Sequence, residues 1–316
     1  MDGDVIPRHG LGTAPLGGLF TEVTEEDARA TVHAALHQGI RYFDTAPLYG
    51  NGLAEARLGA ALQESGIARE QISISTKVGR VLVPGIDSDS AFRDGSALRP
   101  QFDYSADGIR RSLDESLVRL QIDHIDLVLV HDPDDHESDA LATAFPTLIR
   151  LRDEGVIGAI GVGMNQVAML TRFATKADDI GLDYVLAAGR WTLLDRSAGL
   201  VGGLLDTCAA NNVRVIIGGV FNSGLLANPS AGGTFDYVAA DDATVAVAQK
   251  MASVCRDFNV ALTAAALQFP WRHAASSTVL VGARNAAEVE RNQIDAAAEI
   301  PDALWPALEA CLAGSH

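Results

Sequence analysis

The amino-acid sequence predicts one α/β domain, a (β/α)8 barrel spanning residues 1–316. Short β-branched runs alternate with longer amphipathic stretches along the whole chain, and eight strand-like runs are each followed by helix. The runs, such as LVLV and VRVIIGG, are apolar on both faces, which is typical of parallel strands buried on both sides. An open dinucleotide-binding sheet is disfavoured because no G-x-G-x-x-G follows an early strand.

We expect the first strand in the opening GLGTAPLGG segment, residues 10–18. The other seven strands are expected at residues 41–46, 72–78, 124–130, 158–162, 184–188, 213–217 and 278–281. Two polar stretches, 79–103 and 221–240, are too long for ordinary barrel connections and are expected to be functional loops at the C-terminal face.

Helices are expected at residues 24–38, 53–64, 105–120, 138–154, 167–180, 200–211, 242–258, 262–274, from 286 onward, and at 303–312. The first begins with an S/T-x-x-D/E cap, from Thr24 to Asp27. The third is supported by four aliphatic residues that recur on one face at spacings of 4, 4 and 3.

The composition is that of a globular protein, with 48% hydrophobic and 21% charged residues. A net charge of −17 repels phosphate backbones and anionic lipid, so we expect neither nucleic-acid nor membrane partners. Three widely spaced cysteines without a C-x-x-C fit a reducing compartment and argue against disulfides or a zinc site. The first residues lack the basic start of a signal peptide, and the most apolar run is far shorter than a membrane helix. We therefore expect a cytoplasmic protein without a metal.

Polar side chains end three consecutive strands of the expected barrel. Asp44 ends the second and is followed by Tyr49 in DTAPLYG, Lys77 ends the third in ISTKVG, and His131 ends the fourth in LVLVHD. Each alone has a structural explanation, as a helix cap, a packed ring, a solvated charge or a structural histidine. Barrel enzymes place catalysis at these strand ends, and neighbouring strands lie about 4.8 Å apart. Together the four residues predict a catalytic set.

The four residue types suit proton transfer coupled to hydride transfer. A phenol with a pKa near 10 is a poor base at neutral pH, and an ammonium within about 4–6 Å lowers that pKa. We expect Lys77 to act in this way on Tyr49, and Asp44 to hold Lys77 charged and oriented. His131 is expected to hydrogen-bond the reacting oxygen. A nicotinamide cofactor would carry the hydride.

These motifs, with SLDESLVRLQIDHIDLVLVHD, GVG-x-N and the closing VGARNAAEVERN, resemble the aldo-keto reductase superfamily over nearly the whole chain. The resemblance implies a TIM barrel with NAD(P)-dependent carbonyl reduction or alcohol oxidation. The family's catalytic Asp, Tyr, Lys and His fall on Asp44, Tyr49, Lys77 and His131. Within the family, AGRWTLLD and IIGGVFNSGLLA look most like the bacterial D-threo-aldose and L-fucose dehydrogenases, with pyridoxal 4-dehydrogenase as a close relative.

The resemblance also implies cofactor and substrate contacts. Cofactor contacts are expected at Asn165, Gly219, Phe221, Asn222, Leu225, Gly282, Arg284, Glu288 and Asn292. Substrate contacts are expected at Phe20, Leu48 and Trp191. The sequence departs from the family where an aromatic ring stacks on the nicotinamide, because Gly218-Gly219 stands there and Phe221 is the nearest ring. It departs again at residues 187–189, Ala-Ala-Gly, where many members have a glutamine.

The segment after the last strand bears on the choice of dinucleotide. Its helix N-terminus should face the adenosine phosphates. Arg284 can contact a ribose 2′-phosphate, but the Glu288 carboxylate repels that phosphate and accepts from a free 2′-hydroxyl, which favours NAD over NADP. Asn285 and Glu288 also have the spacing of a capping box, so a purely structural role for Glu288 stays open.

The resulting functional hypothesis is oxidation of C1 of an aldose, such as L-fucose or a D-threo-aldose, to the lactone. The alternatives are pyridoxal 4-dehydrogenation or general aldehyde and ketone reduction. A non-enzyme alternative is a cofactor-sensing regulatory subunit, which the intact four-residue set disfavours. The expected partner is a small sugar or aldehyde, and we assign no oligomeric state.

Overall fold

The computed structural model describes residues 6–87, 91–93, 97–230 and 232–312. The barrel strands are β1 (His9–Gly12), β2 (Tyr42–Asp44), β3 (Ser73–Val78), β6 (Ile125–His131), β7 (Ile157–Met164), β8 (Tyr184–Ala188), β9 (Arg214–Gly218) and β12 (Ser276–Gly282). All pairs are parallel, and the sheet closes in the order β1-β12-β9-β8-β7-β6-β3-β2. The predicted (β/α)8 barrel is confirmed.

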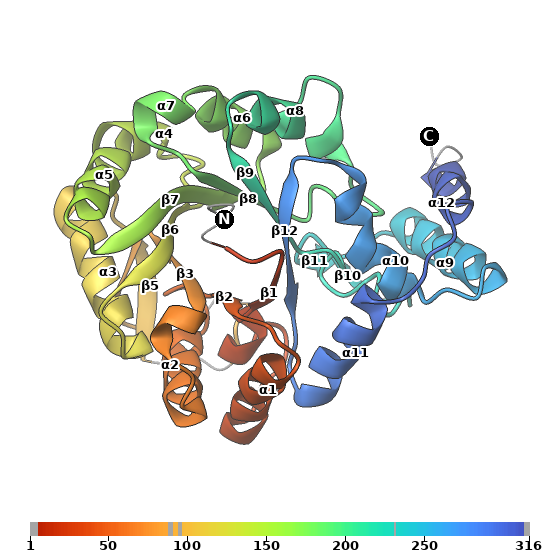
Figure 1. The fold of residues 1–316 in the computed structure, drawn as a ribbon, viewed down its shortest axis with the longest axis horizontal. Helices are drawn as coiled ribbons and strands as arrows, with labels where there is room; N and C mark the ends of the chain where they lie inside the picture. The colour runs from red at the N-terminus through yellow and green to blue at the C-terminus, as the bar shows by residue number, and fades with distance from the viewer. Residues whose placement is uncertain (1–5, 88–90, 94–96, 231, 313–316) are drawn as a thin grey trace.

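Helices surround the strands in a ring (Figure 1). They are α1 (Glu25–His37), α2 (Leu53–Ser65), α3 (Ala106–Leu120), α4 (Glu137–Asp139), α5 (Phe145–Asp153), α6 (Val167–Thr175), α7 (Ala177–Ile180), α8 (Leu204–Ala210), α9 (Asp242–Asp257), α10 (Leu262–Gln268), α11 (Ala286–Ala296) and α12 (Leu304–Leu312). α9 and α12 pack together outside the ring, beside α10. Within the described ranges, every helix is too short or too polar to span a bilayer.

The sequence signals place most helix starts correctly. The Thr24 side chain accepts a hydrogen bond from the Asp27 N–H at 3.0 Å and begins α1 as predicted. The predicted helix 138–154 is instead interrupted by a π-helical turn, Ala140–Ala144, next to Pro146, which has no N–H to donate to the preceding turn. The first strand is also shorter than predicted, because β1 ends at Gly12 and a 3-10 turn follows.

Each of the two long loops contains an antiparallel hairpin that the sequence pattern did not predict. β4 (Arg80–Pro84) pairs with β5 (Leu98–Phe102), directly after β3. β10 (Thr234–Phe235) pairs with β11 (Val238–Ala239), after β9. In the second hairpin Asp236 and Tyr237 form a two-residue turn with φ of +49° and +65°, the backbone twist that tight hairpins prefer. Both hairpins follow the carboxyl ends of barrel strands, where the site is expected.

The barrel interior has an apolar part and a polar part. The apolar part is a cluster of buried side chains: Ile6, Tyr42, Leu127, Leu129, Ala159, Tyr184, Leu186, Ile216 and Leu280. A larger cluster lies between the strands and the helices and includes Ile74 and Val78 of β3. Side chains alternate along a strand, so Ser75 and Lys77 of β3 point inward. They make the carboxyl end of the interior polar.

Candidate active site

A buried ion pair lies between β2 and β3. Lys77 Nζ donates to Asp44 Oδ1 at 3.0 Å, to Asp44 Oδ2 at 2.8 Å and to the Thr45 carbonyl at 2.8 Å. The Lys77 and Asp44 side chains are only 2% and 5% exposed. Burial of an ammonium is tolerated when its donors are satisfied, and here all three have an acceptor. These three hydrogen bonds hold the Lys77 ammonium in one position.

Asp44 is also held by a chain of hydrogen bonds from the barrel interior. Ser75 Oγ donates to Asp44 Oδ1 at 2.7 Å, and the Tyr42 hydroxyl lies 2.9 Å from Ser75 Oγ. Because Ser75 gives its hydrogen to Asp44, Tyr42 donates to Ser75. Burial, and then the Asp44 charge, raises the pKa of Tyr42 well above its usual range, so this donor keeps its proton.

Tyr49 lies between Lys77 and His131. Lys77 Nζ is 4.7 Å from the centroid of the Tyr49 ring, over its face. The Tyr49 and His131 rings are nearly perpendicular, at 87°, with centroids 6.2 Å apart. Phe92 packs on Tyr49 with a centroid separation of 5.7 Å. The structure thus brings together all four residues that the strand ends suggested.

The expectation that the pKa of Tyr49 lies below its usual value is wrong. Burial raises this pKa well above its usual value, and the charges of Asp44, Tyr237 and Asp132 raise it further, while Arg80 lowers it. Asp44 neutralises the Lys77 charge, and the ammonium lies over the ring face. Tyr49 therefore rests as a protonated phenol, which is a proton donor.

His131 rests in the neutral form. Burial lowers its pKa well below the usual value, and the positive charges of Lys77 and Arg80 lower it further. The hydroxyl of Tyr104 donates to the His131 carbonyl at 2.7 Å and so fixes the end of β6. A neutral imidazole in a fixed position can hydrogen-bond a substrate oxygen without adding charge.

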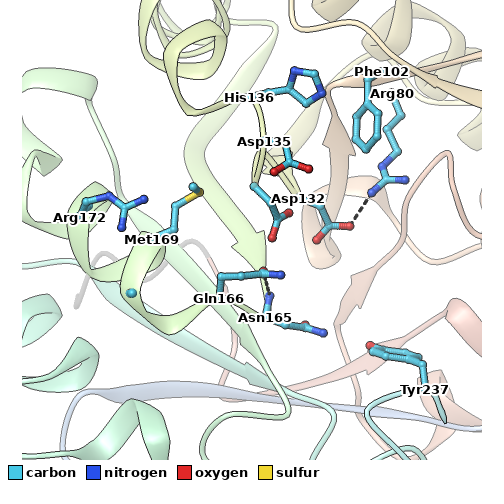
Figure 2. A pocket seen from close by; sticks show the side chains of 12 residues that line it. Arg80, Phe102, Asp132, Asp135, His136, Asn165, Gln166, Met169, Arg172 and Tyr237 are labelled. Atoms are coloured by element: carbon cyan, nitrogen blue, oxygen red, sulfur yellow. Dashed lines mark hydrogen bonds and ion pairs between the residues drawn. The ribbon is translucent and has the colours of Figure 1, made fainter.

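A polar cavity of about 820 Å³ opens beside these residues (Figure 2). Its lining residues are Arg80, Phe102, Asp132, Asp134, Asp135, His136, Asn165, Gln166, Ala168, Met169, Arg172 and Tyr237. Asp132 connects the cavity to the four residues, because its Oδ2 lies 3.5 Å from His131 Nε2. The four catalytic candidates are not among the lining residues, and Asp132 is the lining residue that lies beside His131.

Two amide side chains can hold a nicotinamide cofactor. Asn165 lines the cavity, and its carboxamide points into it in Figure 2. Asn222 is buried, with a φ of +46°; its Nδ2 donates weakly to the Gly189 carbonyl at 3.5 Å, and its Oδ1 has no hydrogen-bond partner among the described residues. A buried acceptor without a donor is costly, and a carboxamide N–H would satisfy it. The residues present thus fit the group.

The other cofactor candidates after β9 have mixed placements. Gly219 has a φ of +65° and turns the chain at the end of the strand, where a residue with a side chain would be strained. Phe221 is half-buried and packs against the core, and Leu225 lies wholly inside it. Gly219 is therefore the one of the three that is exposed, with its carbonyl accepting from the Asn222 N–H at 2.8 Å.

The segment before α11 forms the cap that its spacing suggested. Asn285 Oδ1 accepts from the Glu288 N–H at 2.9 Å. The Glu288 carboxylate accepts from the Arg284 N–H at 2.8 Å and from Arg284 Nε at 2.9 Å. Asn292 donates to the Gly282 carbonyl at 3.5 Å and ties the helix to the end of β12. Arg284 is therefore already paired with a carboxylate.

The three substrate candidates are not together. The Phe20 ring centroid lies 6.2 Å from that of Tyr237, which lines the cavity. Leu48 is half-buried directly before Tyr49 in the chain. Trp191 instead packs in the core: its Nε1 donates to the Pro270 carbonyl at 3.1 Å, and its ring lies 4.8 Å from that of Phe269.

Several residues of the site escaped the sequence reasoning. Asp132 directly follows the end of β6, and Arg80 follows the end of β3 after one glycine, so extending each strand end by two residues would have found both. Tyr237 lies in the β10–β11 hairpin, far along the chain. Arg190 connects three loops, with donors 2.9 Å from the Asn165 carbonyl, 2.8 Å from Asp195 and 2.7 Å from Asp236.

Comparisons with known proteins agree with this geometry. The model of the Aldo/keto reductase family matches residues 9–313. A D-threo-aldose 1-dehydrogenase of Pseudomonas sp is 42% identical and a pyridoxal 4-dehydrogenase of Microbacterium luteolum 39%, each over 97% of this chain and 94% of the relative. A glycerol dehydrogenase structure from Gluconobacter oxydans superposes with a TM-score of 0.75 at 23% identity, over 98% of this chain and 92% of that one.

The family match and the two dehydrogenase relatives, together with the barrel fold, show an NAD(P)-dependent oxidoreductase. The chain belongs to the aldo/keto reductase family.

Proposed function

We propose that the chain oxidises C1 of an aldose, such as L-fucose or a D-threo-aldose, to the lactone, and that Asp44, Tyr49, Lys77 and His131 carry the reaction. The observation that carries this proposal is Tyr49, set between a fully paired Lys77 and a neutral His131 beside a polar cavity. The substrate class is supported by the charged and amide side chains of that cavity, and by the name of the 42% identical relative.

A bound nicotinamide supplies the hydride acceptor for oxidation and the hydride donor for reduction. During oxidation the C1 hydrogen would leave with its electron pair to the nicotinamide, and the C1 hydroxyl proton would pass to the ionised form of Tyr49, which becomes a phenol. During reduction Tyr49 gives its proton to the carbonyl oxygen. His131 holds that oxygen in line, while Asp44 keeps Lys77 charged against the Tyr49 ring.

The proposed cofactor is NAD, with NADP used less well. Asn165 and Asn222 would hold the nicotinamide carboxamide. The Arg284 guanidinium is neutralised by Glu288, so it offers little net positive charge to a 2′-phosphate. Glu288 can serve as a cap residue and disfavour NADP at the same time, because one of its oxygens bonds the Arg284 N–H and the other bonds the guanidinium.

A second candidate substrate is pyridoxal, or another small aldehyde. It is favoured by the 39% identity to a pyridoxal 4-dehydrogenase over the same extent of chain. Pyridoxal is also a small, hydroxylated ring compound that fits a polar cavity of about 820 Å³.

Reduction of NAD and NADP with a panel of aldoses and pyridoxal tests the proposed substrate class. Tyr49→Phe tests the proposed catalytic set: we expect activity to fall about 10²–10⁴-fold while reduced cofactor still binds in a fluorescence titration. Tyr184→Phe, which removes another phenol hydroxyl from the barrel interior, is the matched control. A Tyr49→Phe enzyme that keeps about a tenth of wild-type activity would contradict the assignment.

A further inference from the structure

We propose that Asp132, held by Arg80, selects substrates that carry a hydroxyl on the carbon next to the reacting carbon. For an aldose this is the C2 hydroxyl, which would donate to Asp132 Oδ2 while His131 Nε2 holds the C1 oxygen. The inference rests on the proposed aldose oxidation and adds the part of the sugar that the site recognises.

The backbone of Asp132 is held in a strained conformation. Its φ is +42°, in the left-handed region that residues with a side chain rarely adopt. Its N–H donates to the Gly163 carbonyl at 3.0 Å, and its carbonyl accepts from the Tyr104 hydroxyl at 2.9 Å. The two hydrogen bonds fix this conformation and so hold the direction in which the Asp132 side chain leaves the backbone.

An ion pair with Arg80 holds the Asp132 side chain in position. Arg80 Nη2 donates to Asp132 Oδ2 at 2.8 Å across the cavity wall, as Figure 2 shows. The same Oδ2 lies 3.5 Å from His131 Nε2, which is too long for a good hydrogen bond. Two polar atoms at this spacing can each bind one of two neighbouring sugar oxygens, because vicinal oxygens lie about as far apart as hydrogen-bonded ones, about 2.8 Å.

The Asp132 carboxylate lines the cavity and lies beside His131. Burial raises the pKa of Tyr49 and that of Tyr237, and the Asp132 charge adds to the rise in both. Burial raises the pKa of Asp132 itself, and Arg80 and Lys77 oppose that rise. An ionised carboxylate only accepts hydrogen bonds, so it recognises a hydroxyl and gives nothing to an ether or ring oxygen.

The alternative is that the pair only anchors the β4–β5 hairpin to β6. Arg80 begins β4 and its guanidinium lies 4.4 Å from the Phe102 ring centroid on β5, so the pair does connect the hairpin to the barrel. An anchor predicts that loss of the charge affects all substrates alike. Recognition of a hydroxyl predicts an additional loss only for substrates that carry it.

The test compares an aldose with its 2-deoxy analogue. We expect the wild-type enzyme to prefer the aldose in kcat/KM by about 10–100-fold, the size of one charge-assisted hydrogen bond. Loss of the Asp132 charge acts on Tyr49 equally with both sugars, so the diagnostic quantity is the ratio of the two kcat/KM values, and Asp132→Asn should reduce that ratio to within about threefold of one. Asp123→Asn, an exposed isosteric change ahead of β6, is the control and should leave both values unaltered.

The outcomes separate the two proposals. A wild-type enzyme that uses aldose and 2-deoxyaldose equally well overturns the role of Asp132, whether or not the variant folds. Parallel losses on both sugars in Asp132→Asn also overturn it and leave the hairpin anchor. A wild-type enzyme that oxidises no aldose, but oxidises pyridoxal, overturns the proposed function and this inference with it.

Discussion

The resting protonation of Tyr49 predicts opposite pH dependences for the two directions of the reaction. Burial and Asp44 hold the pKa of Tyr49 well above its usual value of about 10. Oxidation needs the phenolate as a base, and even a phenol with a pKa of about 10 is only about 0.1% ionised at about pH 7. Each added pH unit multiplies that fraction by about ten. The oxidation rate should therefore rise about tenfold per unit from about pH 7 to about pH 9 without levelling.

Reduction needs the protonated phenol, which is the dominant form over the same range, so its rate should stay flat. Titration of His131 should not change either rate near neutral pH, because burial and the charges of Lys77 and Arg80 hold its pKa well below the usual value. The assay is the steady-state rate of aldose oxidation and of aldehyde reduction in matched buffers at saturating cofactor, with Tyr49→Phe as the baseline. An oxidation rate that levels near neutral pH, or a reduction rate that falls there, would refute the reasoning.

Three further outcomes are expected. Lys77→Met leaves the Asp44 carboxylate uncompensated, so the alkaline rise of the oxidation rate should move to higher pH by about one pH unit or more. The free energy of unfolding in a denaturant titration should also fall by about 3–5 kcal/mol. Glu288→Gln should reduce the preference for NAD over NADP in kcat/KM; an unchanged ratio would leave Glu288 as a cap alone. Arg190→Gln removes the link between Asp236 and the barrel, so KM should rise several-fold more than kcat falls, while equal changes in both would argue against a role in substrate binding.

The part of the site predicted from sequence is the part that the barrel itself positions. The carboxyl ends of β2, β3 and β6 are neighbours in the closed sheet, and hydrophobic alternation is enough to locate those ends. Asp44, Lys77 and His131 could therefore be grouped without coordinates. Tyr49 followed because only a few residues separate it from Asp44.

The rest depends on contacts between segments far apart in sequence. The β10–β11 hairpin has two residues per strand, too few for a periodic pattern, and its attachment depends on Arg190 of another loop. Trp191 was expected to contact the substrate, but it packs on Phe269, which lies in the 3-10 turn after α10. That contact joins segments far apart in the sequence, so the sequence pattern did not reveal it. The direction of the Tyr49 pKa shift depends on burial, which residue types alone do not give.

The charges around Tyr49 explain why burial decides its protonation. Lys77 is paired with Asp44 on one side of the ring, and Arg80 with Asp132 near His131, so each cation is matched by a carboxylate 2.8 Å away. With the charges balanced, desolvation favours the neutral form of every remaining group. A protonated phenol and a neutral imidazole are the state from which a carbonyl oxygen is protonated. Oxidation of a sugar must start from the Tyr49 phenolate, whose population rises with pH.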